Sequence, residues 1–196
     1  MTFFRILGPL EVQDEGRLVP LGGTKQRAVL AILLLNRGEI VSVDRLADEL
    51  WGEEPPDTAT KTVQVYVSRL RKELGQDAVL TRGGGYVLDI EPAQLDAARF
   101  TRLTDEGRAA LQRGEANTAS DLLREALALW RGTPLGDLAY EPFAQSQIAR
   151  LEELRLVALE HRVDADLELG EAAALVPELE TLVREHPARE RVRLAA

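Results

Sequence analysis

The chain has 196 residues, of which 45% are hydrophobic and 5% aromatic, and its net charge is −9. This length allows one or two domains, and the scarcity of aromatic residues favours helical cores rich in leucine and alanine. Because cysteine is absent, disulfides and thiolate metal sites are excluded. No run of about 18 apolar residues occurs and no signal-peptide pattern opens the chain, so we expect a cytoplasmic protein with no membrane contact.

The first third of the chain predicts a small sheet followed by a buried helix. Three short β-prone runs, separated by turn residues, cover 3–7, 10–13 and 18–21. An almost continuous apolar stretch then predicts a buried helix from Thr24 to about Asn36, with Thr24 as its cap and Gly38 as its stop.

The next segment has the pattern of a helix-turn-helix. Ser42 is expected to cap a helix over 43–51, which Gly52 and two prolines end. A further helix is expected over 58–74, with Asp57 as its cap and Gly75 as its stop. Two helices joined by a short turn are the arrangement that this class of DNA-binding motif requires.

A glycine-centred hairpin follows the helix pair directly. The runs 79–82 and 86–90 flank Gly83-Gly84-Gly85, which predicts two antiparallel strands and a tight turn. Arg82 lies at the expected tip, where a wing can enter the minor groove or contact phosphate. Residues 1–91 therefore predict an α+β winged helix-turn-helix.

The helix over 58–74 has two unlike sides when it is projected at about 100° per residue. The apolar side consists of Ala59, Val63, Tyr66, Val67, Leu70 and Leu74. The opposite side consists of Lys61, Gln64, Val65, Ser68 and Lys72, flanked by Arg69 and Arg71. Glutamine can pair with adenine, arginine and lysine with guanine, and a valine methyl can contact thymine. This side therefore predicts a major-groove surface.

Local charge supports that prediction although the chain is acidic. Residues 1–91 carry 11 basic and 14 acidic side chains, and residues 92–196 carry 13 and 19. Between 58 and 83 the balance reverses, because five basic residues accompany only Glu73 and Asp77. Phosphate contact depends on charge at the contact surface and not on the charge of the whole chain.

Residues 92–196 predict an all-α domain. Helices are expected at 96–113, 115–130, 142–169 and 171–186, with another beginning near Ala188. Helix pairs with short glycine breaks favour an α-solenoid of the tetratricopeptide (TPR) type. The amphipathic pattern near Ala188 has only begun when the sequence ends. We therefore expect either that the domain is truncated at its C-terminus or that something else covers its apolar face.

Specific segments resemble the Streptomyces antibiotic regulatory protein (SARP) family. The first half matches its OmpR/PhoB-type winged helix in DELWGEEPP, VYVSRLRKELG and GGGYVL. The second half matches its bacterial transcriptional activation domain in LDAARFTRL and LLREALALWRGTPLGDL. The resemblance implies a transcriptional activator that binds direct promoter repeats as a homodimer or higher assembly, recruits RNA polymerase and controls secondary-metabolite genes.

The resemblance also implies a set of DNA-contacting residues. On the recognition helix these are Lys61, Gln64, Val65, Ser68, Arg69, Arg71 and Lys72. On the wing they are Thr81, Arg82 and Gly83. Lys25 and Arg27, at the basic start of the first long helix, are expected to touch phosphate.

Signals of other functions are weak. His161 and His186 lie on separate expected helices without a second histidine at ligand spacing. Gly22–Lys25 lacks the first glycine of a phosphate-binding loop, and no nucleophile motif occurs. We therefore expect no enzyme activity, no catalytic or metal site and no cofactor. The competing hypothesis is a protein-interaction module in which the acidic helical half is the working part.

Overall fold

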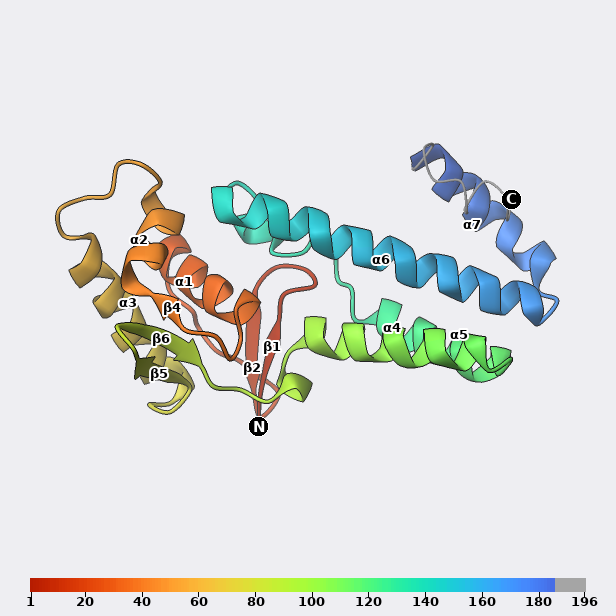
Figure 1. Cartoon of the computed structure of the whole chain (residues 1–196), viewed down its shortest axis with the longest axis horizontal. Helices are drawn as coiled ribbons and strands as arrows, with labels where there is room; N and C mark the ends of the chain where they lie inside the picture. The colour runs from red at the N-terminus through yellow and green to blue at the C-terminus, as the bar shows by residue number, and fades with distance from the viewer. Residues whose placement is uncertain (186–196) are drawn as a thin grey trace. The chain divides into compact units, whose positions relative to one another are not determined.

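The computed structural model describes residues 1–185, and its internal contacts divide the chain into two units (Figure 1). The first unit comprises Met1–Arg99 and Trp130–Leu151, and the second comprises Phe100–Leu129 and, within the described part of the chain, residues 152–185. The domain division at 91/92 stays a prediction. By contact, however, residues 130–151 from the second half of the sequence belong with the first unit.

The first β-prone runs form an antiparallel sheet, as predicted. Its strands are β1 (Thr2–Arg5), β2 (Glu11–Asp14) and β3 (Arg17–Leu18), in that spatial order. Glu15 and Gly16 join β2 to β3 with φ angles of 49° and 79°, as a two-residue hairpin turn requires. Strand β1 ends earlier than predicted, because the next two backbone N–H groups bind a side chain instead.

That side chain is Asp96, the first residue of α4 (Asp96–Gln112). Its carboxylate accepts the N–H of Ile6 at 2.8 and 2.9 Å and the N–H of Leu7 at 3.0 Å. Burial raises the pKa of the Asp96 carboxyl, and the hydrogen bonds from Ile6, Leu7 and Ala97 and the nearby Arg131 oppose that rise. Asp96 thereby fixes the end of β1 against the start of α4.

Three helices form the core of the first unit. They are α1 (Thr24–Leu35), α2 (Val43–Trp51) and α3 (Ala59–Leu74). Residues 28–34 of α1 are all buried, as their unbroken apolar run predicted. The Ser42 hydroxyl accepts the Arg45 N–H at 3.1 Å, which confirms the predicted cap of α2.

Two other predicted caps are wrong by one residue. The cap of α1 is Gly23, whose carbonyl accepts the Arg27 N–H, so Thr24 is already helical. The cap of α3 is Thr58, whose carbonyl accepts the Thr62 N–H, whereas Asp57 lies before it in the turn. Neither cap residue makes a side-chain capping bond, so the pattern of polar residues did not decide these boundaries.

The predicted hairpin forms from β5 (Val79–Arg82) and β6 (Gly85–Leu88), and an unpredicted two-residue strand, β4 (Val41–Ser42), pairs with β6. The spatial order is β4-β6-β5. Gly83 and Gly84 make the turn with φ of 54° and 80°. A Cβ at Gly85 would lie 2.2 Å from the Val41 carbonyl oxygen, so glycine permits the close approach of β4.

Residues 130–151 complete the core of the first unit. The N–H of Arg131 donates to the Leu7 carbonyl at 2.7 Å, and the N–H of Leu135 donates to the Ile6 carbonyl at 3.0 Å. The short 3-10 helix Gly136–Leu138 and the start of α6 (Pro142–Glu168) follow. Their apolar side chains, among them Leu138 and Phe143, belong to the same buried cluster as those of α1 and α3.

The second unit contains the rest of α4, α5 (Ala116–Ala128), the rest of α6, and α7 (Ala172–Glu185). Gly107 of α4 permits close contact with α5, since a Cβ there would lie 2.7 Å from the Leu123 side chain. Between α5 and α6, the Ser120 hydroxyl donates to the buried carboxylate of Asp166 at 2.6 Å. These bounds confirm the four predicted helices to within a few residues.

The expected fold class is confirmed: an α+β winged helix-turn-helix followed by TPR-like helices (Figure 1). The helix expected near Ala188 lies outside the described residues. Over residues 1–185, no helix has the length and apolar character needed to cross a membrane.

Candidate nucleic-acid interface

The outward side of α3 is exposed as the sequence predicted. Its buried residues are Ala59, Val63, Val67 and Leu70. Its exposed residues include Lys61, Gln64, Val65, Ser68, Arg69 and Lys72. Val65 is 46% exposed, a large fraction for a valine on a helix that packs against two others. We call these six exposed residues the α3 face.

The polar groups of the α3 face are unpaired within the described part of the chain. The side chains of five members make no hydrogen bond or ion pair with another residue of 1–185: Lys61, Gln64, Ser68, Arg69 and Lys72. The face contains no carboxylate, and its members recur three or four residues apart along one side of the helix. The face therefore presents cationic and hydroxyl donors, the Gln64 amide and the Val65 methyl groups to a ligand. No internal hydrogen bond of these side chains has to break before the ligand binds.

The wing, residues 79–88, begins five residues after α3 ends. Its strands lie beside α3 (Figure 1). Arg82 and Gly83 are exposed at its turn, and the Arg82 guanidinium makes no hydrogen bond or ion pair within residues 1–185. Thr81 is also exposed, but its hydroxyl is already bonded to Arg71. Of the three expected wing contacts, Arg82 thus carries the one charge, and its guanidinium is unpaired within residues 1–185.

Arg71 does not lie on the α3 face. Its Nε donates to the Val79 carbonyl at 2.7 Å, and its Nη2 donates to the Thr81 hydroxyl at 2.7 Å. Its guanidinium carbon lies 5.8 Å from the centre of the Tyr86 ring. The helical projection put Arg71 beside the outward side, but its long side chain turns toward the wing.

Lys25 and Arg27 are engaged within the first unit. The Lys25 ammonium donates to the Leu50 carbonyl at 2.5 Å and to the Glu141 carboxylate at 3.0 Å. The Arg27 guanidinium binds Asp137, with Nε at 2.7 Å, and donates to the Leu10 carbonyl at 2.6 Å. Sequence reasoning missed these carboxylates, because they lie more than a hundred residues away along the chain.

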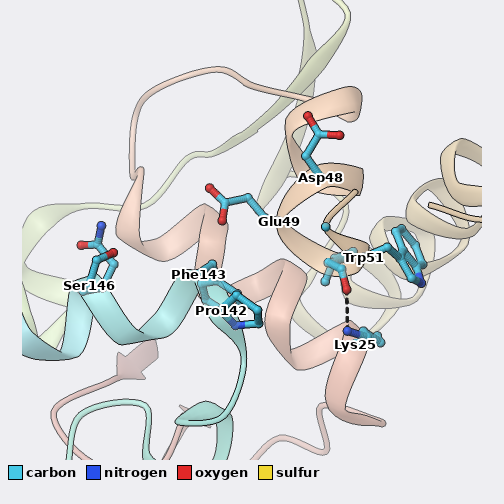
Figure 2. Close-up of a pocket in the computed structure, with 10 residues that line it drawn as sticks. Lys25, Asp48, Glu49, Trp51, Pro142, Phe143 and Ser146 are labelled. Carbon is cyan, nitrogen blue, oxygen red and sulfur yellow. Dashed lines mark hydrogen bonds between the residues drawn. The ribbon is translucent and has the colours of Figure 1, made fainter. Parts of the chain in front are cut away.

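An open pocket of about 490 Å³ lies beside Lys25 (Figure 2). The end of α2 and the start of α6 line it, with Glu49, Trp51 and Phe143 among the lining residues. The hydrogen bond from the Lys25 ammonium to the Leu50 carbonyl is the dashed line in Figure 2. Among residues 1–185, no three histidine, aspartate or glutamate side chains are grouped so that they could hold a metal ion.

Two family models together match nearly the whole chain. "Transcriptional regulatory protein, C terminal" matches residues 17–88, and "Bacterial transcriptional activator domain" matches residues 95–196. The regulatory protein DnrI of Streptomyces peucetius is 40% identical over 94% of this chain and 72% of its own length. The regulatory protein AfsR of Streptomyces coelicolor is 43% identical over 97% of this chain and 19% of its own length.

A solved structure is also similar. Mycobacterium tuberculosis EmbR, in complex with a low-affinity phosphopeptide, superposes with a TM-score of 0.95 and 38% identity, over 97% of this chain and 52% of that chain. The chain thus spans about a fifth of AfsR, half of EmbR and most of DnrI.

A winged helix with an exposed basic face, joined to an activation domain, defines the class: a DNA-binding transcription regulator and not an enzyme. Within that class, the chain belongs to the SARP family of transcriptional activators, as its sequence motifs predicted.

Proposed function

We propose that the chain binds promoter DNA sequence-specifically, with α3 in the major groove and the wing at the adjacent backbone or minor groove. The observation that carries this proposal is the α3 face, which is exposed, basic and free of internal hydrogen bonds. A protein that must exchange internal bonds for DNA contacts loses part of the binding free energy, and this face has none to exchange.

Base reading falls to the middle of the α3 face. Gln64 can bond adenine in a bidentate manner, and Val65 can contact a thymine methyl. Lys61, Arg69 and Lys72 surround this pair with positive charge, suited to guanine or to phosphate. Arg82 supplies a separate contact from the wing.

Direct repeats and a homodimer or higher assembly fit the short reach of one recognition helix. A single helix reads only a few base pairs, so two chains on neighbouring sites are needed for a site that is rare in a genome. The number of chains per site, the recruitment of RNA polymerase and the control of secondary-metabolite genes belong to this proposal on the strength of the family.

The test is a DNA-binding titration on the promoter beside the chain's own gene, with Lys61→Ala and Gln64→Ala as the test variants. Each is expected to lose about 1–3 kcal/mol of binding free energy if it contacts a base. Arg108→Ala serves as the control, because Arg108 is an exposed cation on α4 in the second unit. Unchanged affinity in both test variants would remove the recognition-helix assignment.

Salt dependence separates this function from the protein-interaction alternative. Affinity that rests on phosphate contacts falls steeply as salt rises, with a slope that grows with the number of contacts. A chain that acts only by docking on another protein would show no such duplex affinity at any salt concentration.

A further inference from the structure

We propose that Arg71 is a positioning residue that fixes the wing, and with it Arg82, at one place relative to α3. We call the contacts of Arg71 with Val79, Thr81 and Tyr86 the Arg71 clamp. The inference rests on the proposed DNA-binding function, and it gives Arg71 a task other than base reading. It starts from the difference between Arg71, which is partly buried and bonded, and its exposed neighbours Arg69 and Lys72.

The clamp uses both the donors and the plane of the guanidinium. Nε and Nη2 donate to two different residues of β5, each at 2.7 Å, while the Tyr86 ring lies 5.8 Å away. Only a planar group with several fixed donors can make these contacts together. A lysine at this position would keep the charge but could not bond both acceptors in the same geometry.

The topology of the wing explains why β5 needs this support. Strand β5 is the edge of the β4-β6-β5 sheet. Because the Asp89 N–H binds the Ala78 carbonyl, alternation along the strand turns the Val79 carbonyl away from β6. Arg71 satisfies this outward-facing acceptor, which the sheet itself cannot reach.

The remaining contacts lie on the same face of the hairpin. Thr81 pairs directly with Tyr86 across the two strands, so their side chains project to one side. Val79, two residues before Thr81, projects to that side as well and is fully buried. The last turn of α3 therefore holds β5 at two residues, Val79 through its edge carbonyl and Thr81 through its side chain.

Arg82 is the next residue after Thr81 and the last before the glycine turn. On the opposite edge, β4 holds the hairpin only through Val41 and Ser42. An isolated two-stranded hairpin is marginally stable, so its tip depends on such lateral contacts. By fixing Thr81, the clamp sets the distance between Arg82 and the α3 face, and hence which DNA groups the two can reach together.

Thr81→Val is the central variant for testing the clamp. It removes one of the two acceptors of Arg71, keeps the shape and strand preference of the residue, and leaves every charge in place. We expect DNA affinity to fall about threefold to tenfold, the loss that one hydrogen bond represents. Thr81→Ser retains the hydroxyl that accepts from Arg71, so the amide signals of its wing in the free chain are expected to match those of the unaltered chain.

Combining Thr81→Val with Arg82→Ala distinguishes positioning from direct contact. If the clamp positions the wing, Arg82→Ala costs less in the Thr81→Val background than alone, because Arg82 is already misplaced. Arg71→Lys keeps its charge but should displace Arg82. The dependence of DNA affinity on salt concentration should then fall by the equivalent of about one phosphate contact. Additive losses and an unchanged salt slope would overturn the proposal. Arg108→Lys controls for the exchange of arginine for lysine at an exposed site.

A measurement without DNA separates this inference from the proposed function. In NMR spectra of the free chain, Thr81→Val and Arg71→Lys are expected to shift and broaden the amide signals of residues 79–86, while those of the α1 core stay in place. Unchanged wing signals would overturn the clamp. If the unaltered chain binds no duplex, it is the DNA-binding proposal that fails, and the wing signals still decide the clamp.

Discussion

Arg27 and Asp137, which are 110 residues apart in the sequence, form an ion pair in which Arg27 Nε donates to Asp137 Oδ2 at 2.7 Å. The other oxygen of the same carboxylate accepts the Leu10 N–H at 2.7 Å. One side chain from residues 130–151 thus satisfies both a cation of α1 and the backbone before β2. The winged helix is therefore stabilised by a segment that the family's activation-domain model covers.

Replacing this carboxylate should destabilise the first unit. Asp137→Ala leaves the Leu10 N–H without its partner and Arg27 without its counter-charge. We expect a loss of about 1–3 kcal/mol in the free energy of unfolding, measured by urea titration of the whole chain. Asp105→Ala is the control, since Asp105 makes only an exposed pair with Arg108, and it should change stability by less than about 0.5 kcal/mol. Equal effects of the two substitutions would contradict the role of Asp137.

The buried Asp96 carboxyl should make stability depend on pH. Burial raises its pKa above 3.8, so the folded state binds a proton more tightly than the unfolded state does. The stability that comes from this tighter proton binding is therefore fully present below the unfolded pKa, and it is lost as pH rises through the raised folded pKa. Thermal unfolding of the unaltered chain and of Asp96→Asn is measured from below the unfolded pKa to above the raised folded pKa. The stability of the unaltered chain relative to Asp96→Asn should decrease as pH increases. A difference that stays constant or grows would contradict the raised pKa.

Gly85 is expected to tolerate no side chain. The Cβ of Gly85→Ala would lie 2.2 Å from the Val41 carbonyl oxygen, and only movement of the β4 backbone could relieve that contact. We expect the unfolding temperature to fall by several degrees, as a loss of about 1–2 kcal/mol would produce. Gly136→Ala is the control, because Gly136 has no positive φ and an added Cβ there would meet no atom closer than 3.8 Å. Comparable melting of both variants would show that β4 adapts without cost.

Asp166 should be the most sensitive polar residue of the second unit. Its side chain is fully buried, and it accepts the Ser120 hydroxyl and one guanidinium N–H each from Arg124 and Arg162. Removing one partner of a buried charge cluster leaves the others uncompensated, so Asp166→Ala is expected to cost about 3–5 kcal/mol. Circular dichroism during urea unfolding would measure it. Asp121→Ala on the exposed side of α5 should have little effect, and a loss as large there would refute the special role of Asp166.

Local features of the sequence predicted local structure well. Ser42 caps α2 because its hydroxyl and the Arg45 N–H are three residues apart, a distance that the helix itself fixes. The glycine turn at Gly83-Gly84 and the buried run of α1 likewise depend on neighbours in the chain. The sequence did not predict the short strand β4, because two residues are too few to show an alternation of apolar and polar side chains. They form a strand only because they pair with β6.

The sequence by itself determined the winged helix, the helical half and the exposed side of α3, because periodic burial of apolar residues requires no knowledge of distant partners. Only the tertiary structure decided which cations remain available. Lys25 and Arg27 are neutralised by Glu141 and Asp137, and Arg71 turns toward the wing. The reason is physical: a long charged side chain bonds whatever acceptor the folded chain brings within reach, and that acceptor's position in the sequence leaves no periodic trace.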